Sequence, residues 1–185
     1  TRVLENGSVF EKAGVNTSVV SGPIHDHERP MFDQLLSHQN IHVQKDTPLS
    51  FLATGISLVI HPKNPFIPTT HANYRYFELQ GLETPIWWFG GGTDLTPYYL
   101  FEADATHFHQ TLKEACDAFD ETYYLLFKKK CDTYFHLPHR NECRGIGGIF
   151  MDYLSDRPRE TLFEFIKGLK SFLFCISFLK CLNKP

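Results

Sequence analysis

Two histidines, an asparagine and an arginine lie close together in one short stretch, IHPKNPFIPTTHANYRYFE at residues 60–78. Histidine changes its charge near neutral pH, and arginine binds a carboxylate through two parallel hydrogen bonds. If residues 70–81 form a strand, side-chain alternation puts His71, Asn73 and Arg75 on one face. Such a face would suit proton transfer to an anionic ligand. A half-solvated sheet with satisfied polar side chains is the alternative.

The apolar stretch before this motif, residues 51–62, predicts a neighbouring strand that ends at Pro62. On that strand Ser57 and His61 share a face with Val59. If the two strands pair, a hydroxyl, two imidazoles, an amide and a guanidinium converge on one surface. The local sequence leaves three roles open for the two histidines: metal ligands, a catalytic acid and base, or core residues.

A glycine-rich motif, WWFGGGTDLTPYY, follows at residues 87–99. It has neither the GxxxxGK[ST] pattern nor the GxGxxG spacing, which argues against a nucleotide site. We expect a strand over residues 85–92 that ends in a turn at the glycines, where close backbone approach or positive φ is needed. Asp94 would then lie in a turn or cap.

Four further histidines lie in the second half of the chain. His107 and His109 are two residues apart in a predicted helix, so their side chains diverge and cannot form one chelate. His136 and His139 fall in a predicted loop. A metal site would have to take single histidines from separate elements, a grouping that spacing alone cannot establish.

The elements that must position these residues change in type along the chain. Period-two patterns and turn residues dominate the first half, and helical periodicity begins near Ala105. Strands in sequence order joined by short turns favour an antiparallel sheet, and helices gathered late favour an α+β fold. The expected strands are 14–22, 51–62, 70–81, 85–92 and 144–154, and the expected helices are 32–37, 105–119, 123–134 and one from Pro158.

Composition excludes several classes of function. The formal net charge is −3, which argues against binding nucleic acid through phosphate neutralisation. Five cysteines without a CxxC pair favour reduced thiols over a disulfide framework or a zinc knuckle. The apolar end of the chain contains a charge-free stretch of nine residues at 171–179, well short of the roughly 20 needed for a transmembrane segment.

Seven motifs in this sequence resemble the oxygen-dependent coproporphyrinogen III oxidases. They are FEKAGVN, ISLVIHPKNP, THANYRYFE, WWFGGGTDLTPYY, HFHQTLKEACD, CDTYFHLPHRNE and RGIGGIFMDYL. The resemblance implies a large antiparallel β-sheet flanked by α-helices and a homodimer. It also implies oxidative decarboxylation of two propionates of coproporphyrinogen III to vinyl groups, which gives protoporphyrinogen IX. O2 is the co-substrate, and no organic cofactor is implied.

The resemblance also implies roles for individual residues. His71 matches the proposed proton donor of the family. The substrate-binding positions correspond to Ser57, Asn73, Tyr74 and Arg75. Four histidines described as ligands of a divalent metal in bacterial members correspond to His61, His71, His109 and His139.

Two other classes of function stay open at this point. The chain could be a non-catalytic tetrapyrrole-binding remnant of the family. It could also be a non-haem metal oxidase, in which two histidines and a carboxylate from Asp94 or Asp152 hold iron with open positions.

The resemblance covers residues 1–170, so we expect a partial oxidase domain there, incomplete at its C-terminus, followed by a divergent apolar tail at 171–185. A sheet that lacks strands exposes backbone donors and apolar side chains. The isolated chain should therefore be poorly soluble or partly folded and have negligible oxidase activity. We expect a cytoplasmic location, with the mitochondrial intermembrane space as the alternative for a eukaryotic source.

Overall fold

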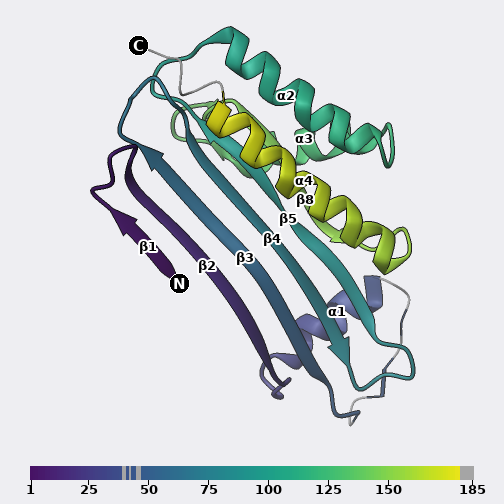
Figure 1. The fold of residues 1–185 in the computed structure, drawn as a ribbon. Helices are drawn as coiled ribbons and strands as arrows, with labels where there is room; N and C mark the ends of the chain where they lie inside the picture. The colour runs from purple at the N-terminus through teal and green to yellow at the C-terminus, as the bar shows by residue number, and fades with distance from the viewer. Residues whose placement is uncertain (39–40, 42, 45–46, 180–185) are drawn as a thin grey trace.

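A computed structural model describes residues 1–38, 41, 43–44 and 47–179 of the chain. Its main feature is an antiparallel sheet in the spatial order β1-β2-β3-β4-β5-β8 (Figure 1). These strands are β1 (Arg2–Glu5), β2 (Phe10–Pro23), β3 (Ser50–Pro62), β4 (Thr69–Gln80), β5 (Ile86–Thr96) and β8 (Gly147–Leu154). The expected α+β fold with a large antiparallel sheet is confirmed.

Three helices from the second half of the chain lie together over one side of the sheet (Figure 1). They are α2 (Glu102–Asp117), α3 (Tyr123–Tyr134) and α4 (Arg159–Leu179). Apolar side chains of alternate strand positions, such as Leu58, Ala72 and Ile149, pack with helix residues such as Phe108 and Phe165 in one buried cluster. A side chain of this kind contributes roughly 1.5–3 kcal/mol when it is fully buried.

The opposite side of the sheet is covered at one end by α1 (Arg29–His38). Phe32 of this helix stacks on Phe77 of β4 with ring centroids 6.0 Å apart. Leu36 and Leu79 are buried in the same small cluster. Because Phe77 shares its face with Arg75 and His71, α1 packs on the side of the sheet that carries the predicted site residues.

The glycine motif does not form the expected turn. β5 continues from Ile86 through the three glycines to Thr96. Gly91 has φ +135°, and a Cβ placed on it would lie 2.0 Å from the carbonyl oxygen of Asn73. The glycines therefore allow close contact between β5 and its neighbours, which keeps the strand paired where a turn was predicted.

The remaining expectations match the structure with shifts at the ends of elements. Neither β1 nor the small hairpin of β6 (His136–Leu137) and β7 (Glu142–Cys143) was predicted from the sequence. The predicted boundary at residue 170 lies inside α4, and residues 180–185 lie outside the described part. Among the described helices, none combines the length and apolar character needed to span a bilayer.

Substituting Gly91 by alanine tests the close strand approach. The added Cβ would clash with backbone and force an unfavourable φ, so Gly91→Ala should lower the free energy of unfolding by about 3 kcal/mol or more. Gly14→Ala is the matched control, because a Cβ at Gly14 of β2 meets nothing within 4 Å. Urea denaturation measures both changes, and equal small effects would show that the close approach is unimportant.

Candidate active site

Strand register brings the predicted polar residues onto one face of the sheet. Ser57 of β3 lies opposite Asn73 of β4, and Val59 lies opposite His71. On the other side of β4, His71 pairs with Asp94 of β5. The two strands therefore pair, which was the condition for the predicted shared surface, and β5 adds a carboxylate to the same face.

Asp94 is the centre of a three-residue cluster. Its carboxylate accepts a hydrogen bond from Nδ1 of His71, with Nδ1 and Oδ1 2.6 Å apart. Its other oxygen, Oδ2, accepts from Nη2 of Arg144 at 2.7 Å. The Asp94 side chain is 1% exposed, so both interactions act on a carboxylate that is almost completely removed from water.

An aromatic ring fixes the two partners of this carboxylate. The guanidinium carbon of Arg144 lies 3.8 Å from the centroid of the Phe135 ring, within the range of a cation–π contact. The edge-to-face contact of Phe135 with His71 has ring centroids 6.4 Å apart. Since Nδ1 of His71 is bound to Asp94, Nε2 is the ring nitrogen left to exchange a proton with a ligand.

A cavity of about 340 Å³ opens at this cluster. His61 is part of its wall, and Nδ1 of His61 lies 3.3 Å from the hydroxyl oxygen of Thr69. The complete lining consists of Val59, His61, Thr69, His71, Asp94, Thr96, Pro97, Tyr98 and Arg144. The two histidines of the opening motif thus face the same cavity.

Further along the same face, Arg75 and Asn73 supply groups suited to an anionic ligand. Nη2 of Arg75 lies 3.6 Å from Oδ1 of Asp152, a loose and half-exposed ion pair. Oδ1 of Asn73 and Nε of Arg144 are buried and have no hydrogen-bond partner among the described residues. Buried polar atoms are normally satisfied, so the lack of a protein partner at these two atoms is unusual.

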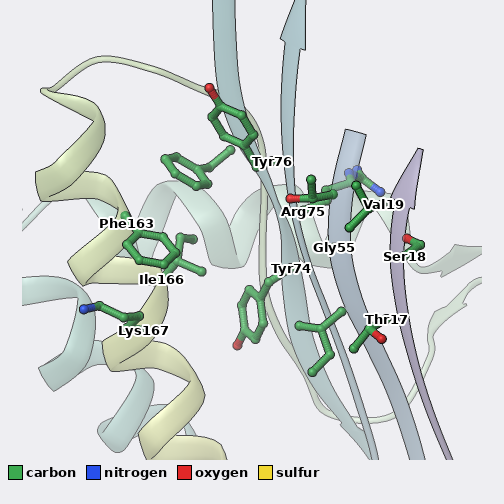
Figure 2. A pocket seen from close by; sticks show the side chains of 13 residues that line it. Thr17, Ser18, Val19, Gly55, Tyr74, Arg75, Tyr76, Phe163, Ile166 and Lys167 are labelled. Carbon is green, nitrogen blue, oxygen red and sulfur yellow. The ribbon is translucent and has the colours of Figure 1, made fainter. Parts of the chain in front are cut away.

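Tyr74 lies on the opposite side of the sheet from its two neighbours in sequence. Figure 2 shows Tyr74 and Tyr76 pointing toward α4, whereas Arg75 points away from that helix. A cavity of about 440 Å³ lies there between α4 and β2–β4. Burial raises the pKa of the Tyr74 hydroxyl. The side chain of Tyr74 therefore does not join the surface formed by His71, Asn73 and Arg75.

Comparison with known proteins identifies the family. A family model described as "Coproporphyrinogen III oxidase" matches residues 1–184. The chain belongs to this family. It is 54% identical over 169 residues to the oxygen-dependent coproporphyrinogen-III oxidase of Drosophila melanogaster. The matched region covers 91% of this chain and 42% of the relative.

Other relatives carry the same description. A protein of Francisella tularensis subsp. novicida is 51% identical over 166 residues, or 89% of this chain and 50% of the relative. A Rattus norvegicus relative, described as mitochondrial, is 54% identical over 168 residues, or 90% of this chain and 37% of the relative. The chain thus spans half or less of the length of these coproporphyrinogen oxidases.

The four histidines that the family resemblance marks as metal ligands do not come together. His61 and His71 line one cavity, but His139 is exposed in the turn between β6 and β7. His109 uses both ring nitrogens: Nε2 donates to the carbonyl oxygen of Ile146 at 2.9 Å, and Nδ1 lies 3.1 Å from the Tyr124 hydroxyl. Within the described residues, no group of three or more His, Cys, Asp or Glu side chains could hold a metal ion.

Sequence reasoning missed the roles of Asp94 and Arg144. It assigned Asp94 to a turn or cap and named it only as an alternative metal ligand. Extending the strand past the glycines would have placed Asp94 on a strand, but the register that sets it opposite His71 comes from the structure. Arg144 had no comparable signal, since it comes from a turn 50 residues away from Asp94.

The environment of His109 predicts a pH effect on stability. Burial lowers the pKa of His109 below its ordinary value of 6.5, and Lys128 acts in the same direction, while the Ile146 carbonyl and Asp132 oppose the shift. Between the lowered folded pKa and 6.5 the unfolded chain binds more protons. The free energy of unfolding should therefore fall as the pH drops through this window and become level below it.

Urea denaturation between about pH 5 and pH 8 measures this effect. His109→Gln should remove its part of the pH dependence, because glutamine does not titrate. His107→Gln is the control, since it lies on the same helix but points in another direction. The assignment is wrong if both variants keep the pH dependence of the unchanged protein.

Proposed function

We propose that this chain forms part of an oxygen-dependent coproporphyrinogen III oxidase and carries the proton-transfer region of its active site. The observation that supports this proposal best is the His71–Asp94–Arg144 cluster on the same open sheet face as Arg75 and Asn73. In this reaction two propionates of coproporphyrinogen III become vinyl groups, and the product is protoporphyrinogen IX.

The chemistry requires an oxidant and a proton for each propionate. A propionate loses CO2, one hydrogen as a proton and two electrons, and a carbon–carbon double bond forms. O2 accepts the two electrons and two protons and becomes hydrogen peroxide. One of these protons comes from the propionate and the other from the surroundings, so a residue that supplies or relays a proton is needed at the reacting pyrrole.

His71 is the proposed proton carrier. Its Nδ1 is bound to the buried carboxylate of Asp94, which orients the ring and leaves Nε2 toward the ligand. Removing or relaying a pyrrole proton would let the electron-rich ring react directly with O2. Proton transfer by a positioned side chain typically contributes about 10²–10⁴-fold to the rate.

Carboxylate binding is the second requirement, because the substrate carries several propionates. Arg75 is exposed and only loosely paired, so it can bind a propionate through two hydrogen bonds. Asn73 and Ser57 lie next to it on the same face. Arg75 lies four residue steps along the strand from His71, roughly 13 Å, which lets one ring be held near His71 while another carboxylate is bound at a distance.

Several finer parts of the family resemblance remain predictions for this chain. They are the homodimer, the divalent metal of bacterial members, the absence of an organic cofactor, and a cytoplasmic location.

Substitutions in a full-length family member with the same residues at these positions test the assignment. His71→Ala removes the proton carrier and should lower turnover by about 10²–10⁴-fold. Arg75→Lys keeps the charge but loses the paired geometry, so it should mainly raise KM and affect turnover far less. Formation of protoporphyrinogen IX under air measures both, and small effects of equal size would refute the roles given to the two residues.

The 185-residue chain by itself should be a poor enzyme. It holds His71 and Arg75 but spans half or less of its relatives, so we expect low solubility and negligible formation of protoporphyrinogen IX. Expression of residues 1–185, a thermal unfolding scan and an oxidase assay check this. A cooperative transition together with turnover close to that of a full-length relative would contradict it.

A further inference from the structure

His109 is a predicted site residue that does not line the cavity beside His71, yet both of its ring nitrogens have hydrogen-bond partners. It belongs to α2 on the helix-covered side of the sheet, and its ring is half-buried. The carbonyl oxygen of Ile146 can only accept a hydrogen bond, so Nε2 of His109 must carry the proton. Nδ1 is then unprotonated and accepts from the hydroxyl of Tyr124. No lone pair of the ring is left for a metal in this arrangement.

His109 binds Ile146, which belongs to the same turn as Arg144. Ile146 is fixed on both sides of its peptide: its N–H donates to the carbonyl oxygen of Leu95 at 3.1 Å, and its carbonyl accepts from His109. Leu95 follows Asp94 directly in β5. The turn is therefore attached next to the carboxylate that its arginine must reach.

Close backbone contacts restrict the position of the turn at residues 144–147. Gly145 has φ +59°, and a Cβ placed on it would lie 2.2 Å from the carbonyl oxygen of Leu95. The N–H of Arg144 donates to the carbonyl oxygen of Phe135 at 3.1 Å, the same residue whose ring stacks on the guanidinium. With these contacts, α2 and the residue that directly follows α3 both hold the segment that forms the Arg144–Asp94 ion pair.

We propose that His109 is a positioning residue for the active site: its Nε2–H bond to Ile146, supported by Tyr124, holds the 144–147 turn so that Arg144 stays on Asp94. This role replaces that of a metal ligand for His109. It builds on the proposed oxidase function, because Arg144 and Asp94 matter for turnover only if their cluster is the reacting site. His109 itself does not touch the substrate.

A double-mutant cycle with Arg144 separates positioning from a general structural role. In a full-length family member with these residues, His109→Ala should lower kcat by up to about 100-fold and change KM less. This is the loss expected when a group of the active site, here Arg144, is displaced by about 1 Å. If His109 acts through Arg144, then His109→Ala should cost nothing further in an Arg144→Met background. Additive losses of activity would show that His109 does not act through Arg144.

Conservative variants guard against loss of folding. His109→Gln retains an N–H donor at a similar reach and should recover most of the turnover lost in His109→Ala. Tyr124→Phe leaves the bond to Ile146 and should have a smaller effect than His109→Ala. His107→Ala, on the same helix, is the control and should keep kcat. A failure of glutamine to restore turnover in a variant that unfolds cooperatively would overturn the proposal.

Two measurements do not depend on oxidase activity. Side-chain nitrogen NMR should show His109 as the Nε2–H tautomer, and a crystal structure of His109→Ala should show Arg144 displaced from Asp94. Titration with Mn²⁺ or Zn²⁺ should give the same bound metal with and without His109. An Nδ1–H tautomer, an unmoved Arg144, or metal binding lost with His109 would each refute the positioning role. If these three measurements come out as expected but the protein without substitutions shows no oxidase activity, only the proposed reaction is refuted.

Discussion

The structure of the site depends on one buried carboxylate. Asp94 lies near the end of the paired strand β5, and its side chain is 1% exposed. An ionised carboxylate in such a place costs several kcal/mol in lost hydration unless charged or hydrogen-bonding partners compensate. Its two oxygens bind His71 and Arg144, one from the adjacent strand and one from a distant turn. The need to satisfy both oxygens fixes the position of an imidazole and a guanidinium relative to each other.

The sheet divides the molecule into an apolar face under the helices and a face that carries the polar side chains. Alternation along β4 sends Ala72 and Tyr74 into the core under the helices, and sends His71, Asn73 and Arg75 to the other side. On that second side α1 covers the end near Phe77, and Tyr134 at the end of α3 stacks on Phe150 of β8 with ring centroids 4.4 Å apart. Arg75 stays exposed on this side, and His71 borders a cavity.

Two histidines show how environment decides role. His71 is paired with a carboxylate and borders a cavity, so one ring nitrogen is free for a ligand. His109 is hydrogen-bonded at both nitrogens, and burial lowers its pKa, so the ring stays neutral over a wider range and acts as a fixed link between helix and turn. The family resemblance marks both as metal ligands, but their surroundings in this chain give them different chemistry.

The sequence by itself determined the family, the α+β class and the shared face of Ser57, His71, Asn73 and Arg75. These features follow from long motifs and from the period of two in a strand, which are local properties. Tertiary structure decided what depends on distant partners. The glycines stay in β5 because neighbouring strands approach closely, Arg144 reaches Asp94 across 50 residues, and α2 places His109 on Ile146. No local pattern records such contacts, because they exist only once the strands, the turn and the helices have packed together.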